Sequence, residues 1–339
     1  LLCVPNQYEP DPMFPTVSFP NPEEKGALDA SMAYAAENGC DFIVANDPDA
    51  DRLAVAEWDA STGAWKVFSG NNLGVLLAHW QIMQYKQKKR TSAPADKGPA
   101  VLTTVVSSRM LKAVAAAEGV TYSDTLTGFK WIGNRALEMT KEGYAVLFSY
   151  EEALGYCTGN KLCDKDGISA ACVFVEMKLA LAGHADGPKT VREHLLSLYA
   201  QYGEFVSYNS YVFCHDKQLT KQIFARLRQG DGEGGYWTEC AGEKIVSVHD
   251  ITRGYDSTAE NKASALPATP ESEMLMFEFG NSVSVTLRTS GTEPKIKFYT
   301  EVQGQAGDTT AALTEKLTAF VEGVIEEMLQ WRVHSLARP

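Results

Sequence analysis

The sequence lacks a long apolar run and any paired-cysteine pattern. A membrane-spanning helix needs about 20 predominantly apolar residues, and the most apolar stretch, residues 168–183, is interrupted by Glu176 and Lys178. The seven cysteines are odd in number and scattered, no Cys-x-x-Cys pair occurs, and there is no Asn-x-Ser/Thr sequon. This pattern argues against a disulfide framework or a zinc site and favours reduced thiols in a cytoplasmic protein.

The sequence is also short of positive charge and of nucleotide-binding motifs. The formal net charge is −12, and a nucleic-acid backbone would be repelled without a concentrated basic face. No Gly-x-x-x-x-Gly-Lys-Ser/Thr motif occurs, and residues 230–235 match Gly-x-Gly-x-x-Gly only formally, because they follow a predicted helix and open none. We therefore expect small-molecule partners, with neither nucleic acid nor a membrane. The sequence leaves the oligomeric state open.

What is present is an ordinary globular composition, with 45% hydrophobic and 22% charged residues in 339 positions, enough for two or three domains. Strand and helix patterns alternate up to about residue 182 and predict a mostly parallel sheet covered by helices. Loops are expected at 125–134 and 151–167, and the serines of 107–119 as helix caps. After about residue 199, grouped strands (274–289, 295–302) and a terminal helix (310–331) predict an α+β domain.

The first candidate site is the stretch "VANDPDADRLAV", residues 44–55, in which Asp47, Asp49 and Asp51 stand at alternate positions before Arg52. Clustered carboxylates repel one another unless a cation lies among them, and hard oxygen ligands select magnesium, calcium or manganese. An EF-hand would need glycine where Arg52 stands and glutamate where Trp58 stands. An aspartyl phosphatase would leave Asp51 and Arg52 without a role, and the remaining alternative is a surface turn.

The second candidate site is "RTSGTEPKIKFY", residues 288–299, where a strand ends in a turn rich in hydroxyl groups. Arg288 can hold a phosphate through two donors, and a turn that contains glycine can direct backbone N–H groups at an anion. An ordinary hairpin turn is the alternative. Two weaker candidates are Gly128 and Lys130 in "TLTGFKWIGNR", and Glu151 and Glu152 in "YEEALGY", which a solvated loop would explain equally well if each stood alone.

Taken in order, these stretches resemble the α-D-phosphohexomutase superfamily, in particular its phosphoglucomutase-2 and phosphopentomutase branch. The likeness runs nearly end to end and includes "FPTVSFPNPEEKGAL", "DKDGISAA" and "CHD". It implies mixed-sheet α/β domains followed by a C-terminal α+β domain. It also implies three parts: the end of domain 2 with the metal loop (1–68), domain 3 with the sugar loops (69–199) and domain 4 with the phosphate loop (200–339).

The resemblance also implies an activity and the residues that carry it. Such enzymes move a phosphoryl group between the 1-position and the 5- or 6-position of a sugar through a phosphoserine and a bisphosphate, with one Mg²⁺ ion and glucose 1,6-bisphosphate or a similar activator. A glucose-1,6-bisphosphate synthase or a non-catalytic sugar-phosphate-binding paralogue would keep the same loops. The implied metal ligands are Asp47, Asp49 and Asp51; the catalytic residues are Arg52 and Lys165; the substrate-binding residues are Gly128, Lys130, Glu151, Arg288, Ser290, Gly291, Thr292 and Lys295.

Two departures from the family pattern shape the expectation. Ala153 stands where many hexose mutases have serine, which favours a pentose phosphate. No loop resembling Thr-Ala-Ser-His-Asn-Pro occurs, so the phosphoserine is expected upstream of Leu1, and the 339 residues alone are expected to catalyse no mutase reaction.

Overall fold

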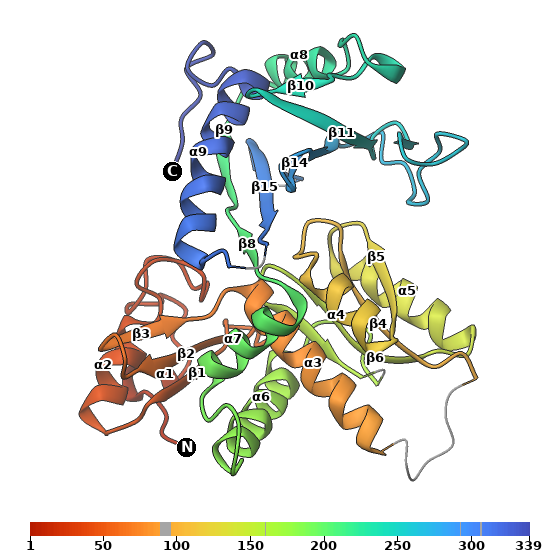
Figure 1. Cartoon of the computed structure of the whole chain (residues 1–339). Coiled ribbons are helices and arrows are strands. Elements are labelled where there is room, and N and C mark those ends of the chain that lie inside the picture. Colours follow the sequence, from red (N-terminus) through yellow and green to blue (C-terminus); the bar gives the residue numbers. More distant parts are fainter. Residues whose placement is uncertain (89–95, 160, 292, 306) are drawn as a thin grey trace. The chain divides into compact units, whose positions relative to one another are not determined.

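The computed structural model describes residues 1–88, 96–159, 161–291, 293–305 and 307–339 (Figure 1). The chain forms two compact units, residues 1–202 and 203–339, and each is described by itself. No helix in these described ranges is long and apolar enough to cross a membrane.

The first unit contains two sheets. The bounds of its strands are β1 Phe42–Ala45, β2 Ala54–Asp59, β3 Ala64–Val67, β4 Pro99–Thr104, β5 Thr121–Thr125, β6 Ala145–Glu151 and β7 Gly155–Thr158. β1, β2 and β3 form an antiparallel sheet in that order. The second sheet has the order β5-β4-β6-β7, with β4 parallel to β5 and β6 and with β7 antiparallel at the edge. The mostly parallel sheet that we predicted is therefore restricted to three strands.

Helices flank these strands. Their bounds are α1 Pro5–Tyr8, α2 Asp29–Glu37, α3 Gly70–Lys88, α4 Met110–Glu118, α5 Phe129–Lys141, α6 Gly167–Ala182 and α7 Val191–Tyr202. α3 packs on β6, and α5 packs on β4, β5 and β6. Phe129, Ile132 and Met139 of α5 join Ala100 and Leu102 of β4 in a buried cluster. This burial closes the α/β layer in which β6 ends at Glu151 and α5 begins just after Gly128.

Two local predictions were wrong, and a third holds only in part. The loop expected at 125–134 is helical from Phe129, and the loop expected at 151–167 contains β7. Ser107 does not cap α4, because its hydroxyl contacts Thr104 and Glu152. Ser108 does accept the Met110 amide, although the residue directly before the helix is Arg109.

The second unit is built on one eight-stranded sheet. Its strands are β8 Phe205–Ser207, β9 Ser210–Phe213, β10 Glu239–Cys240, β11 Glu243–Asp250, β12 Tyr255–Asp256, β13 Met274–Phe279, β14 Val283–Thr289 and β15 Lys295–Gln303. The main order is β10-β11-β13-β14-β15-β8, with β12 on β11 and β9 on β15. All pairings are antiparallel.

Two helices, α8 (Lys217–Leu227) and α9 (Thr310–Leu329), and a 3-10 turn at Glu233–Gly235 complete this unit. α9 packs on β8, β10 and β15 and also contacts α8 (Figure 1). Apolar side chains of α9, among them Leu317, Val321 and Ile325, are fully buried with Val285, Leu287 and Phe298 of the sheet. The C-terminal α+β prediction is confirmed, and the fold is the mixed α/β arrangement that was expected.

Candidate active site

The three aspartates lie in the connection between β1 and β2 and converge on one point. One carboxylate oxygen from each of Asp47, Asp49 and Asp51 lies within 4.8 Å of the others. Among the residues that the structure describes, no other group of three His, Cys, Asp or Glu side chains converges in this way. An all-oxygen set of this kind suits a hard divalent cation such as Mg²⁺.

The aspartate loop is shaped by its own side chains. The Asp47 carboxylate accepts the Arg52 amide at 3.0 Å, and its second oxygen lies 3.3 Å from the Arg52 guanidinium. The Asn46 side-chain amide donates to the Arg52 carbonyl oxygen at 2.6 Å. Burial, together with the charges of Asp51 and Asp49, raises the pKa of Asp47, although the Arg52 amide opposes the rise. The loop therefore holds more negative charge than its own arginine compensates.

A second cation reaches the aspartates from a distant part of the sequence. The Lys165 ammonium lies 2.9 Å from an Asp51 oxygen and 3.6 Å from a Glu151 oxygen. Burial alone would lower the pKa of Lys165, but the hydrogen bond that its ammonium donates to Asp51 and the charge of Glu151 outweigh burial and raise this pKa. Burial and the neighbouring Glu152 raise the pKa of Glu151, against the opposing effect of Lys165. The protonated lysine thus bridges the aspartate loop and the end of β6.

Two glycines permit this approach, because a side chain at either position would collide with its neighbour. A Cβ atom on Gly167 would lie 2.2 Å from the Arg52 carbonyl oxygen and 2.5 Å from the Asn46 amide nitrogen. A Cβ atom on Gly155 would lie 2.5 Å from the aliphatic stem of Lys165. Backbone contacts reinforce the junction, since Gly167 donates to the Ala50 carbonyl oxygen at 3.0 Å and Arg52 forms an isolated bridge with Gly155.

The residues expected to meet the sugar lie at the start of α5. Gly128 precedes this helix with φ +101°, a left-handed value that favours glycine. The Lys130 ammonium lies 5.6 Å from the centre of the Trp131 ring. Gly133, one turn further, faces the Cys163 carbonyl oxygen, which would lie 2.1 Å from an added Cβ atom. The beginning of α5 is therefore packed against the segment that carries Lys165.

The predicted phosphate turn lies in the second unit, between β14 and β15. Arg288 pairs with Met274 of β13 and with Lys297 of β15, near the end of β14. Ser290 donates its amide to the Lys295 carbonyl oxygen at 2.9 Å, and its hydroxyl oxygen accepts the Glu293 amide at 3.3 Å. Gly291 has open space where a Cβ atom would be. Thr292 lies outside the described residues.

Lys295 borders the same turn and already has partners. Its ammonium lies 2.6 Å from the Glu293 carboxylate and 4.1 Å from the centre of the Tyr211 ring. The two units therefore divide the predicted site residues. Asp47, Asp49, Asp51, Arg52, Gly128, Lys130, Glu151 and Lys165 belong to the first, and Arg288, Ser290, Gly291 and Lys295 to the second.

Sequence reasoning missed the residues that shape the aspartate loop. Asn46 lies next to the motif, and an amide beside clustered carboxylates was a usable signal. Gly155 and Gly167 lie inside the quoted stretches "YEEALGY" and "DKDGISAA", but only the fold reveals that a Cβ atom would collide there.

Two models of known protein-family domains match the sequence of this chain. The model of phosphoglucomutase/phosphomannomutase alpha/beta/alpha domain II matches residues 1–60, and that of domain III matches residues 69–202. The chain belongs to the phosphoglucomutase/phosphomannomutase family. The predicted resemblance is confirmed.

Three individual proteins show how similar the chain is to members with named activities. The chain is 42% identical over 336 residues to human phosphopentomutase, covering 98% of this chain and 54% of that protein. It is 42% identical over 330 residues to human glucose 1,6-bisphosphate synthase, covering 96% and 52%. It is 43% identical over 312 residues to phosphoribomutase of Saccharomyces cerevisiae, covering 88% and 49%. The chain thus spans about half the length of the curated relatives it matches.

Solved structures agree on the fold. The open form of the phosphoglucomutase parafusin from Paramecium is similar with a TM-score of 0.60 and 20% identity, over 92% of this chain and 50% of that one. A phosphoglucomutase/phosphomannomutase family protein from Burkholderia thailandensis has a TM-score of 0.54 and 16% identity, over 91% and 51%. At these identities the likeness is one of fold alone.

Proposed function

We propose that this chain is the metal-, sugar- and phosphate-binding part of a phosphosugar mutase of the phosphopentomutase/phosphoglucomutase type. Such an enzyme moves a phosphoryl group between the 1-position and the 5- or 6-position of a pentose or hexose phosphate. The observation that carries this proposal is the convergence of Asp47, Asp49 and Asp51 with Lys165, which also contacts Glu151.

The residues of the first unit would divide the work at the reacting phosphoryl group. The three aspartates would hold one Mg²⁺ ion, which when bound offsets negative charge on a transferring phosphoryl group. The Arg52 guanidinium, 3.3 Å from Asp47, lies at the same loop and would add positive charge there. The protonated Lys165 would exchange a proton with a sugar hydroxyl, and Glu151 would accept hydrogen bonds from the sugar.

The second unit would hold the phosphate that does not react. Arg288 would bind it through two donors, with Ser290, Gly291, Thr292 and Lys295 around it. Gly128 and Lys130 would face the sugar. We also propose the division into residues 1–68, 69–199 and 200–339 as parts of domains 2, 3 and 4, which the matches to residues 1–60 and 69–202 support.

A pentose 1-phosphate is the substrate we favour, because Ala153 removes a hydroxyl that could contact a hexose, and because relatives named phosphopentomutase and phosphoribomutase are 42% and 43% identical. Glucose-1,6-bisphosphate synthesis is the second candidate, since relatives with that name are equally similar. A non-catalytic sugar-phosphate-binding paralogue would bind the same ligands without turnover. Free thiols at all seven cysteines fit the proposed cytoplasmic location.

The phosphoryl group itself would be carried by a phosphoserine from outside the 339 residues, with glucose 1,6-bisphosphate or a similar bisphosphate as activator. Ser107 is buried against Thr104 and Glu152, and Ser108 contacts Asn71 and Met110, so neither is suited to that role.

The test is an assay of the whole gene product, and of the 339-residue chain, with ribose, deoxyribose, glucose and mannose 1-phosphates, each with and without glucose 1,6-bisphosphate and Mg²⁺. We expect the whole product to form 5-phosphate from ribose 1-phosphate fastest and the chain alone to form none. Bisphosphate formation from a separate phosphoryl donor would favour the synthase. Binding without turnover by the whole product would favour the paralogue, and turnover by the chain alone would mean that the phosphoryl carrier has been misplaced.

A further inference from the structure

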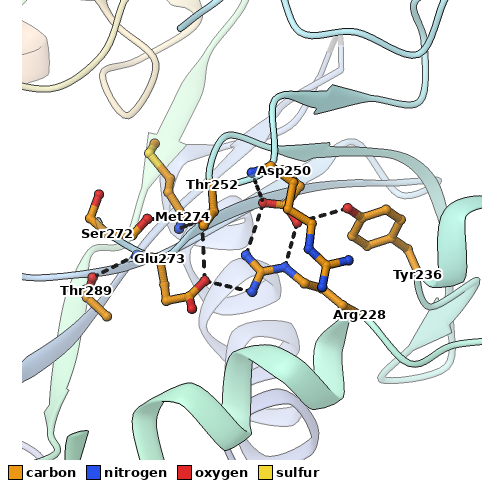
Figure 2. Close-up of polar contacts among 9 residues, drawn as sticks. Arg228, Tyr236, Asp250, Thr252, Ser272, Glu273, Met274 and Thr289 are labelled. Atoms are coloured by element: carbon orange, nitrogen blue, oxygen red, sulfur yellow. Dashed lines mark hydrogen bonds and ion pairs between the residues drawn. The ribbon is translucent and has the colours of Figure 1, made fainter. Parts of the chain in front are cut away.

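A largely buried polar cluster lies at one end of the sheet of the second unit, where β11 and β14 end and β13 begins. Asp250, the last residue of β11, pairs with Leu275 of β13, and Met274, the first residue of β13, pairs with Arg288 of β14. The turn that begins at Ser290 leaves the sheet at this same end. Figure 2 shows that polar side chains connect the three strand ends.

Arg228, at the end of α8, occupies the centre of the cluster. Its guanidinium forms a two-pronged contact with the Asp250 carboxylate, at 2.6 and 3.1 Å, and a third contact with Glu273 at 2.7 Å. The Tyr236 hydroxyl and the Arg253 amide donate to Asp250 at 2.9 and 3.1 Å. Asp250 is fully buried, and only 6% of the Arg228 side chain is exposed. Arg228 is therefore fully engaged by carboxylates and is not itself available as a phosphate ligand.

Contacts with main-chain atoms extend the cluster to Thr289, the last residue of β14, just before the turn. The Thr252 hydroxyl donates to the Ser272 carbonyl oxygen at 3.1 Å and accepts the Met274 amide at 2.8 Å. Thr289 holds Glu273 from the other side: its hydroxyl oxygen accepts the Glu273 amide at 3.1 Å, and its own amide donates to the Glu273 carbonyl oxygen at 3.0 Å. The Thr289 hydroxyl oxygen is thus used to fix strand β14 just before Ser290 (Figure 2).

A purely stabilising role explains this arrangement poorly. Burying Arg228 and Asp250 removes both charges from water, with the Glu273 side chain left 22% exposed, and well-packed apolar side chains commonly stabilise a fold as much or more. What a fully hydrogen-bonded network adds is a defined position for the groups attached to it. Here the attached groups are Arg288 and the backbone of the turn, whose alignment decides how well the turn binds an anion.

We propose that Arg228, Asp250, Glu273 and Thr252 form a positioning network that sets the geometry of the phosphate turn from behind, without touching the ligand. This inference rests on the proposed function, in which the turn holds a sugar phosphate. It predicts that damage to the network weakens phosphate binding more than its effect on stability would explain.

The experiment compares three variants of the 339-residue chain with the wild type. Arg228→Lys keeps the charge but removes the two-pronged contact. Thr252→Val removes the hydroxyl and leaves every charge in place, while Thr252→Ser retains the hydroxyl. The matched control is Arg226→Lys, because Arg226 lies on the same helix but donates to the carbonyl oxygens of Glu327 and Met328 on α9.

Binding is followed by NMR titration of the Ser290 and Gly291 amides with inorganic phosphate and with glucose 1,6-bisphosphate, beside the melting temperature of each variant. We expect Arg228→Lys and Thr252→Val to raise Kd roughly three- to thirtyfold, and Thr252→Ser and Arg226→Lys to leave it within about twofold. In the ligand-free protein, amide hydrogen exchange at residues 289–291 should accelerate in the first pair only.

The outcomes separate this inference from the proposed function. If the wild type binds phosphate and Arg288→Ala abolishes binding, but Arg228→Lys and Thr252→Val change only the melting temperature, the network is structural and the inference is wrong. If the wild type binds no phosphate, the proposed role of the turn is wrong. In either case, if Thr252→Val leaves amide hydrogen exchange at residues 289–291 unchanged, the inference is wrong. This measurement needs neither ligand binding nor the Arg228→Lys variant, so it decides the question even if Arg228→Lys does not fold.

Discussion

The two units carry their candidate sites in opposite ways. In the first, residues 114 and 115 positions apart meet: Asp51 contacts Lys165, and the Arg52 carbonyl oxygen lies close to Gly167, which has no side chain. In the second, the candidate residues Arg288, Ser290, Gly291 and Lys295 are close together in the sequence. Distant residues contact the end of strand β14, at Thr289, just before the turn (Figure 2). A site assembled from distant segments depends on close packing between them, whereas a contiguous turn depends on how its two strands are held.

The largest expected effect is on the assembled site. Asp49→Ala in the whole gene product should reduce turnover at least about a thousandfold, because removing a metal ligand forfeits several kcal/mol of charge stabilisation. The fold should persist, since Asp49 is exposed and loses only repulsion from its neighbours. Turnover is measured at saturating Mg²⁺ beside the melting temperature. Asp41→Ala, an exposed aspartate just before β1, is the control; retained activity in Asp49→Ala would contradict the metal assignment.

Gly167→Ala should disrupt the site of the first unit, because the added methyl group would collide with the aspartate loop. The added Cβ atom would lie 2.2 Å from a backbone oxygen, so the aspartate loop and α6 must separate, and we expect a loss of about 3 kcal/mol in the stability of the first unit. Hydrogen exchange in peptides from residues 1–202 measures this loss. The control is Gly183→Ala at the other end of the same helix, where the nearest atom would lie 3.5 Å away. Equal stability of the two variants would refute the close-approach argument.

The contiguous site should respond to a single side chain. Arg288→Ala should weaken binding of glucose 1,6-bisphosphate by roughly 10- to 100-fold, the effect of losing a charge-assisted, two-donor contact. Arg288→Lys should recover only part of the affinity, because an ammonium group lacks the planar fork. Calorimetry on both variants measures the difference, and unchanged affinity in Arg288→Ala would rule out its phosphate role.

The smallest effect concerns pH and the first unit alone. His79 of α3 and His194 of α7 face each other with ring centres 5.4 Å apart, near Glu118, Lys86, Tyr202 and His184. Burial, followed by repulsion from His79 and His184, lowers the pKa of His194 to about 4; burial also lowers the pKa of His79.

Below about pH 6.5, the ordinary pKa of histidine, the unfolded chain takes up a proton that the folded chain refuses until about pH 4. Stability should therefore fall as the pH falls through this window, by about 2 kcal/mol between pH 7.5 and pH 5. Urea unfolding at pH 7.5 and pH 5 measures the change, and His194→Gln should reduce it. An identical pH dependence in that variant would assign the effect to other groups.

The same contrast explains what could be predicted from the sequence. The aspartate loop and the candidate phosphate turn could be identified as candidates because the residues that suggest their chemistry are close together in the sequence. Helix α5 lies where a loop was expected at 125–134, although Phe129, Ile132, Ala136 and Met139 have helical spacing. Strand β7 was hidden because it is only four residues long, at a sheet edge.

The contacts that complete each site could not be predicted. Lys165 was identified only by resemblance, and its distance to Asp51 depends on how α6 packs against the β1–β2 connection. Likewise, nothing in the local sequence of Arg228 or Asp250 indicates that they meet near Arg288. Residues 230–235, which match a dinucleotide-binding pattern only formally, form a tight turn that leads directly to Tyr236.

Ala50, between two of the proposed metal ligands, has φ +56°, a left-handed conformation in which alanine is about 1 kcal/mol less favourable than glycine. A laboratory selection for heat resistance would therefore be drawn to Ala50→Gly, which relieves that strain. The same change would widen the range of conformations open to Asp49 and Asp51 before a cation binds. At this residue, evolution toward a sturdier protein and evolution toward tighter metal binding would pull in opposite directions.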